Sequence, residues 1–246
     1  MTKKSKLAIG LAVALTLVVG PSALAADEWK FGLGTGFSAL SLDGDIGFEA
    51  PVAGTIIADV DLDNSDTSDM FESGFGFAGY AAKGKWKILY GVGTLTLEDS
   101  DATVKAEWDR TQFEAAGVYT FAKTGNHSWG ALFGVRNVGH EWTITSGMEK
   151  IKVDESWTDG LVGVTHGVPF SEKWSWSTRL DGGFGDSEGT TMFTTGINWH
   201  VGSHWLFNLN AKLTNIEFEN GDPGDSDYYL YDVDETTIGI GFLYNF

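Results

Sequence analysis

The fold class is decided by the stretch Thr236-Thr237-Ile238-Gly239-Ile240-Gly241-Phe242-Leu243-Tyr244-Asn245-Phe246. Successive side chains of a β-strand point to opposite faces. Here one face carries isoleucine, phenylalanine and tyrosine at every even position from 238 to 246, while the other carries mostly threonine, glycine and asparagine. The stretch is therefore predicted to be a β-strand with one apolar and one polar face.

The same alternation recurs through the C-terminal half of the chain. Residues 207–214 alternate Phe, Leu, Ala and Leu with Asn, Asn, Lys and Thr, and residues 174–184 and 193–201 repeat the pattern. One apolar and one polar face, strand after strand, is typical of a barrel with lipid outside and a polar lumen.

Period-two alternation over the whole chain predicts ten strands. Their expected ranges are 29–40, 71–82, 86–97, 108–121, 129–142, 157–170, 174–185, 190–201, 205–218 and 228–246. Residues 52–62 also alternate, and we place them in a long first external loop, as a hairpin above the membrane. Twelve strands are the alternative, if another crossing lies within 41–70.

Four short connections share one form, in which a tryptophan opens the next strand: Trp86, Trp129, Trp174 and Trp205. Trp29 and Phe246 belong to the same set. Tryptophan and tyrosine favour the membrane–water boundary, because their rings are apolar and one edge is polar. These residues are therefore expected to form an aromatic girdle. The alternative, a soluble β-sandwich, would not repeat tryptophan at every second turn.

These patterns predict an all-β fold, a single-chain antiparallel transmembrane β-barrel. Backbone groups left unpaired cannot face hydrocarbon, so the sheet must close. With short turns on the periplasmic side, the longer connections lie outside: 41–70, 98–107, 143–156, 186–189 and 219–227. The first of these, 41–70, is a long acidic external loop.

Residues 1–25 are predicted to be a secretory signal peptide. Lys3, Lys4 and Lys6 precede an apolar run, and Ala23-Leu24-Ala25 is a small-x-small cleavage site. An uncleaved anchor is the alternative, although the run is short for a membrane span. The mature domain would be residues 26–246, carried through the inner membrane to the outer membrane.

Composition narrows the function classes. The chain has 34 Asp and Glu against 16 Lys and Arg, a formal charge of −18, and no cysteine. So negative a chain is not expected to bind nucleic acid. Without cysteine it can form no disulfide.

The C-terminal stretch resembles the closing strand of bacterial outer-membrane β-barrels, whose last residue is part of a signal read by the assembly machinery. Gly241, Tyr244 and Phe246 stand at positions of that signal, and Gly239 stands where a polar side chain is usual. The resemblance implies barrel-assembly machinery and outer-membrane lipid as partners. It implies no oligomeric state.

Three further stretches resemble a family of small, uncharacterised outer-membrane β-barrel proteins of Proteobacteria. They are Asp59-Val60-Asp61-Leu62-Asp63, Lys83-Gly84-Lys85-Trp86, and residues 174–185. The resemblance covers most of the mature chain and implies fold and location without an activity.

Ionisable residues expected to face the lumen are Glu114, Arg136, Arg179, Asp181 and Lys212. Charged side chains that line a narrow pore bias which ions pass. The alternative is a charge-paired plug that fills a small barrel, because ten strands enclose less space than the strands of open porins. The sequence therefore predicts a narrow passive, porin-like channel or a structural barrel.

The acidic loops suggest a second class of function, surface cation or ligand binding. Residues 41–72 hold nine acids and no base, and calcium prefers oxygen ligands. Asp59, Asp61 and Asp63 are the candidate ligands, although Asp66 occupies the place where a calcium loop has its turn glycine.

A lipid-modifying hydrolase is the third class. His140, with Glu141 and Ser146 nearby in sequence, is the histidine expected on the outer side. A Ser-His-acid arrangement requires three groups in hydrogen-bond contact, and this spacing does not demand that. We therefore predict no catalytic residues and no enzyme, and calcium alone as a candidate cofactor.

Overall fold

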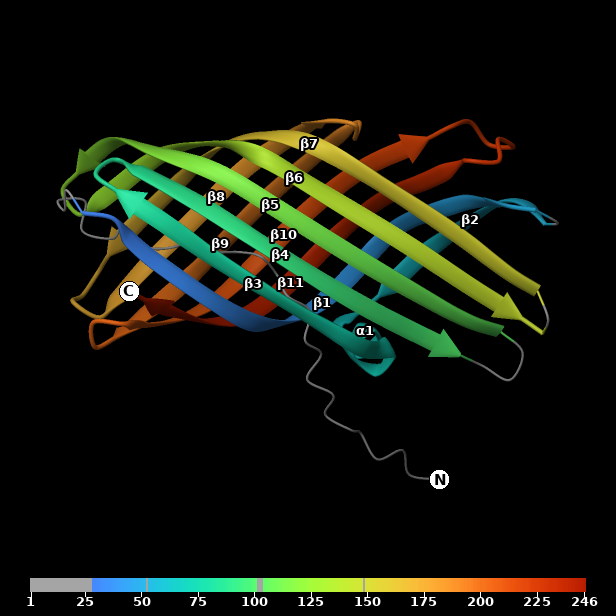
Figure 1. The fold of residues 1–246 in the computed structure, drawn as a ribbon, viewed down its shortest axis with the longest axis horizontal. Helices are drawn as coiled ribbons and strands as arrows, with labels where there is room; N and C mark the ends of the chain where they lie inside the picture. The colour runs from blue at the N-terminus through green and yellow to red at the C-terminus, as the bar shows by residue number, and fades with distance from the viewer. Residues whose placement is uncertain (1–27, 52, 101–103, 148) are drawn as a thin grey trace, which may run out of the picture.

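A computed structural model describes residues 28–51, 53–100, 104–147 and 149–246 (Figure 1). The predicted signal peptide, residues 1–25, lies outside the described residues. None of the helices in the described ranges is long and apolar enough to cross a membrane. The described chain forms β1 (Lys30–Ala50), β2 (Gly54–Leu62), α1 (Asn64–Met70), β3 (Phe71–Lys83), β4 (Trp86–Ser100), β5 (Val104–Thr124), β6 (His127–Ser146), β7 (Glu149–Pro169), β8 (Trp174–Gly185), β9 (Gly189–Val201), β10 (Trp205–Asn220) and β11 (Tyr229–Asn245).

The strands form one antiparallel sheet that closes on itself. β1 pairs with β11 on one side and with β3 on the other, so β1 and β3 to β11 make a ring of ten (Figure 1). β2 pairs with the C-terminal part of β1, from Leu42–Leu62 to Ala50–Gly54. The predicted barrel of about ten strands is confirmed, with Gly54–Leu62 in a hairpin beyond them.

Most outer connections are shorter than the sequence indicated, because the strands continue through them. β4 and β5 extend to Ser100 and from Val104, and β6 and β7 extend to Ser146 and from Glu149. Inward apolar residues explain the extension of β6 and β7: Ile144, Ile151 and Val153 pack on the core beyond the expected strand ends. β5, β6 and β7 have 21, 20 and 21 residues, about twice the roughly 9–11 residues that cross a bilayer, so the barrel projects on this side.

The other end of the barrel has tight turns. Glycines in the left-handed conformation make three of them: Gly84 (φ 58°), Gly125 (φ 61°) and Gly202 (φ 62°). The C-terminus also lies at this end (Figure 1). Five tryptophans are exposed at this end: Trp29, Trp86, Trp129, Trp174 and Trp205. They form the aromatic girdle that the sequence predicted.

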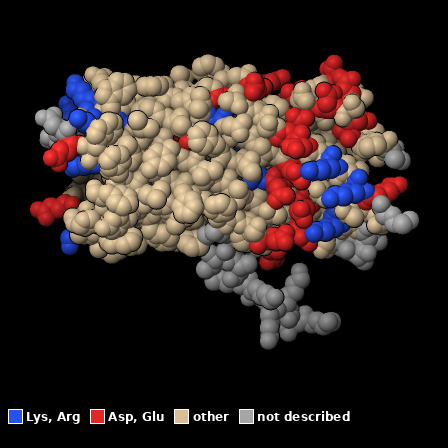
Figure 2. Space-filling model, in the orientation of Figure 1, with Lys and Arg blue, Asp and Glu red and all other residues tan. Residues whose placement is uncertain are grey.

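The outward face is apolar in its middle and charged at its far end. Phe75, Phe133, Val162, Leu209 and Ile240 are among its exposed residues, and Val162 is 53% exposed. Figure 2 shows this band without charges and acids gathered at the long-strand end. We call the band the apolar belt. A soluble sandwich would bury such residues, whereas lipid covers them in a barrel.

Candidate functional site

The inward side chains fill the barrel in three layers. A first apolar cluster lies toward the tight turns and contains Tyr80, Leu89, Val118, Leu132, Leu161, Leu206 and Leu243. A second, larger one lies toward the long-strand end and includes Leu42, Trp108, Trp157, Phe218, Tyr229 and Tyr231. Between them lies a layer of buried polar and charged residues, which we call the charge layer.

Four predicted luminal residues meet in the charge layer. Arg136 Nη2 lies 2.9 Å from Glu114 Oε2 and 3.2 Å from Asp181 Oδ1. Arg179 Nη1 lies 2.6 Å from Glu114 Oε1, and its Nε lies 2.6 Å from Asp181 Oδ2. All four residues are buried. They come from β5, β6 and β8, so the network ties non-adjacent walls of the barrel together.

A second buried pair, missed by the sequence reasoning, joins Arg110 on β5 to Glu235 on β11. The Tyr231 hydroxyl also donates to Glu235 Oε1 at 2.9 Å. Lys212, the fifth predicted luminal residue, is buried on β10 and lines the same cavity as Arg110 and Glu235. Alternation could have placed Arg110 inward with Glu114, since they lie four apart on β5.

The long-strand layer holds the histidine that the sequence placed near the outer rim. His140 is 1% exposed. Its Nδ1 lies 2.8 Å from the Tyr229 hydroxyl, and its ring packs edge-on against Trp108 and Trp157. Glu141 points outward and pairs with Lys152 at 3.0 Å. His140 and Glu141 do not come together, because neighbouring residues of a strand face opposite sides.

The expected calcium loop does not form either. Asp59 and Asp61 lie on β2, while Asp63 is the N-cap of α1. The Asp63 carboxylate accepts hydrogen bonds from the Ser65 and Asp66 backbones at 2.6 and 3.0 Å. A strand followed by a capped helix cannot wrap around an ion as a calcium loop does. The three acids therefore do not converge.

Instead, Asp59 and Asp61 extend two rows of exposed carboxylates across three strands. The register aligns Asp232, Asp45 and Asp59 in one row, and Asp234, Asp43 and Asp61 in the next.

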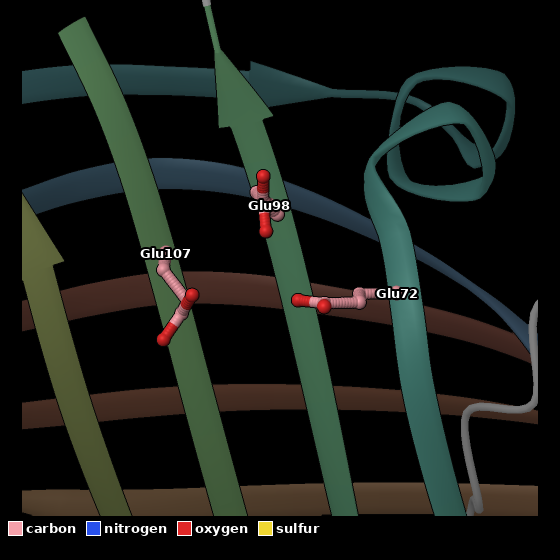
Figure 3. A group of neighbouring side chains, drawn as sticks. All are labelled: Glu72, Glu98 and Glu107. Atoms are coloured by element: carbon pink, nitrogen blue, oxygen red, sulfur yellow. The ribbon is translucent and has the colours of Figure 1, made fainter.

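Another carboxylate group was not anticipated: Glu72, Glu98 and Glu107 (Figure 3). One ligand oxygen from each lies within 4.8 Å of the others. A hydrogen bond that the protonated Glu72 carboxyl donates to Glu98, together with the negative charge of Glu98, raises the pKa of Glu72. Lys105 Nζ bonds Glu98 at 2.9 Å and Glu107 at 3.1 Å. Only the register, which pairs Glu98 with Glu107, could have revealed this group.

The three residues of the expected assembly signal lie on the last strand and just beyond it. Gly241 pairs with Gly36 of β1 and Asn208 of β10. Tyr244 stacks on His204 at 5.4 Å between ring centroids and meets Phe246 edge-on at 5.1 Å.

The sequence matches no family model and no curated protein. Among solved structures, the chain is similar to the outer membrane protease OmpT from Escherichia coli, with a TM-score of 0.54 and 10% identity over 92% of this chain and 99% of that one. A major outer membrane protein of Thermus thermophilus (TM-score 0.41, 15% identity, 89% and 99% covered) and Ail of Yersinia pestis (0.40, 10%, 89% and 99%) also match. The fold of the chain is that of an outer-membrane β-barrel.

Proposed function

We propose that the protein is an integral outer-membrane barrel whose lumen is closed by its own side chains. The observation that carries this proposal is the buried network of Glu114, Arg136, Arg179 and Asp181 between two apolar clusters. Ions cross a pore only where water or polar groups replace their hydration, and paired charges with apolar layers above and below offer no such path. A structural barrel is thus favoured over an open porin-like channel.

Location and orientation form part of this proposal. The apolar belt and the Trp girdle suit a bilayer, and the signal peptide and the C-terminal signal suit delivery by the barrel-assembly machinery. The tight turns would face the periplasm, and the acidic rows would face outward. The resemblance to small proteobacterial outer-membrane barrels fits the same assignment. A non-enzymatic role is supported by the separation of His140 from Glu141.

Ion release from proteoliposomes tests the closed lumen. The mature protein, refolded into vesicles loaded with potassium chloride, should release ions no faster than empty vesicles. An open porin in parallel vesicles provides the positive control. Release at the porin's rate would overturn the proposal.

A narrow passive channel is the second candidate, and the position of Arg179 in the charge layer supports it. If ions pass this layer, replacing Arg179 with Met should change the preference between cations and anions. Lys152→Met, which alters a charge on the outer surface, should leave the preference unchanged. Equal effects of both variants would remove Arg179 from the pore.

Calcium binding is the third candidate, now at Glu72, Glu98 and Glu107 rather than at Asp59, Asp61 and Asp63. Three close carboxylates suit a hard divalent cation, but Lys105 already bonds two of them. Lys105→Met should therefore strengthen calcium binding in calorimetry, and Glu72→Gln should weaken it. Absence of calcium heat at millimolar concentration in both variants would rule out this site.

A further inference from the structure

The wall of the barrel is incomplete at the level of the apolar belt between β1 and β3. Their pairing covers only five positions, from Lys30–Ala82 to Gly34–Ala78. On the other side, β1 pairs with β11 from Gly32 to Phe48. The register with β3 stops at Gly34, and the next strand beside β1 on that side is β2, whose register begins at Leu42. We call this interval, residues 35–41 of β1, the seam.

Side chains, rather than a ladder of backbone bonds, bridge the seam. The Thr35 hydroxyl donates to the Gly76 carbonyl at 2.7 Å. Toward the long-strand end, α1 covers the seam. The Thr67 hydroxyl donates to the Leu40 carbonyl, and the Ser41 hydroxyl donates to Asn64. Figure 1 shows α1 beside this part of the ring.

The lumen next to the seam is hollow because its inward positions carry glycine. These positions are Gly34 and Gly36 on β1, Gly74 and Gly76 on β3, Gly91 and Gly93 on β4, and Gly239 and Gly241 on β11. The opposite wall supplies the bulky side chains of the charge layer. A narrow cavity remains, lined by Gly34, Gly36, Ala78, Leu206, Asn208 and Gly241 among others.

A second cavity adjoins the same stretch of β1, nearer the long-strand end. It is lined by Ser38, Arg110, Gln112, Lys212, Glu235 and Thr237. Within the described ranges, Lys212 has no hydrogen bond or ion pair, although it is only 6% exposed. Glu235 Oε2 is also buried without a partner. The cavity thus holds two buried cations, Arg110 and Lys212, against one buried anion, Glu235. Because an uncompensated buried charge is unfavourable, this excess of positive charge is suited to a ligand that brings an anion.

The outer side of the seam lies in the apolar belt. Phe75 and Phe77 of β3 are exposed there, at 54% and 49%. The outer face of the seam therefore contacts acyl chains rather than water. The cationic cavity lies toward the long-strand end, and the glycine-lined cavity lies deeper in the membrane.

We propose that the seam binds a single-chain amphiphile with an anionic head, either a carboxylate or a phosphate monoester. The head lies between Lys212 and Arg110, and the remaining hydroxyl of a phosphate monoanion can donate to Glu235 Oε2. The chain lies along the glycine-lined cavity and the seam. The order of the two cavities matches an amphiphile in the outer leaflet, with its head outward and its tail toward the bilayer centre.

Calorimetry on the mature protein in phosphatidylcholine nanodiscs tests the site, with dodecanoate and dodecyl phosphate as probes. We expect saturable binding of one molecule per barrel, weakened about tenfold in Lys212→Met because a charge-assisted hydrogen bond is lost. Lys212→Arg should retain binding. Ala78→Leu, which narrows the glycine-lined cavity, should also weaken it. Ala131→Leu on the lipid face and Lys152→Met at the outer rim are the matched controls.

Three further ligands separate the contribution of the head group from that of the chain. Dodecanol should bind more weakly than dodecanoate, and acetate and inorganic phosphate should bind more weakly than the matching amphiphiles. Equal binding by Lys212→Met and the wild type would overturn the head-group assignment. Tight binding of inorganic phosphate alone would overturn the role of the seam, and absence of saturable binding would overturn the site. Heat-modifiable migration confirms that each variant is folded.

Discussion

Glu114 is the acid that both arginines of the charge layer share. Its Oε2 accepts from Arg136, and its Oε1 accepts from Arg179. Removing one member of a buried network leaves the others charged and unpaired in a medium of low dielectric constant. The charge layer therefore stabilises the barrel only while it is complete.

Glu114→Ala should lower the free energy of unfolding by about 3–5 kcal/mol, the usual cost of breaking a buried ion pair. Tryptophan fluorescence during urea titration in lipid vesicles would measure this loss. The control is Glu141→Ala, which breaks the exposed pair with Lys152 and should cost about 0–1 kcal/mol. Equal losses in the two variants would contradict the importance of the network.

The Tyr229 hydroxyl contacts the buried ring of His140 and the partly buried ring of Trp142 in the long-strand layer. It lies 2.8 Å from His140 Nδ1 and accepts from Trp142 Nε1 at 3.2 Å. Tyr229→Phe should cost about 1–3 kcal/mol because buried polar atoms lose their partner, as measured in the same urea titration. Tyr228→Phe is the matched control, since its hydroxyl has no hydrogen bond within the described ranges. An unchanged free energy of unfolding in Tyr229→Phe would show that water replaces the hydroxyl.

At the level of elements, α1 closes the upper end of the seam although it has only seven residues. Such a short helix is not stable by itself, so its capping box and its contacts with β1 hold it. Asp63 caps the backbones of Ser65 and Asp66, and Asp66 accepts from the Asp63 backbone at 3.1 Å.

Asp63→Ala should destabilise α1 by about 0.5–2 kcal/mol, the usual cost of a lost N-cap. Faster hydrogen exchange of Asn64–Met70 would report this. Asp69→Ala, at the other end of the helix, removes an acid from the negative end of the helix dipole and should not speed exchange. Unchanged exchange in Asp63→Ala would mean that packing alone holds α1.

The same cap should depend on pH. The Ser65 hydroxyl and the backbones of Asp66 and Ser65 lower the pKa of Asp63 below its usual 3.8. A carboxyl group with a lowered folded pKa contributes stability above its unfolded pKa and loses it as pH falls through the folded value. Protection of α1 should therefore be constant from pH 7 to 5 and decline below about pH 4. Loss of protection already near pH 6 would point to another group.

Sequence periodicity predicts most elements, and the exceptions have physical causes. The ten crossing strands are predictable because their outward residues meet lipid, which enforces strict alternation. Beyond the apolar belt, toward the long-strand end, water faces the outer surface and the alternation of apolar and polar residues weakens. The sequence therefore predicts loops where β6 and β7 extend. The incomplete β1–β3 boundary has no signature in the sequence, because pairing between distant strands leaves no local signal.

The luminal site follows a similar division. Alternation places Glu114, Arg136, Arg179, Asp181 and Lys212 inside. It does not show that Arg110 reaches across the lumen to Glu235, because that contact depends on barrel diameter. The predicted calcium ligands rest on spacing along the chain, whereas Glu98 and Glu107, which converge with Glu72, are neighbours only across strands.

For the whole molecule, the central claim is that packed side chains close a barrel of ten membrane-crossing strands. Single-channel recording across a planar bilayer tests this most directly, using refolded residues 26–246 at both voltage polarities. The account expects a silent baseline from protein that is demonstrably folded and inserted. Discrete, reproducible current steps from the wild-type protein would contradict it.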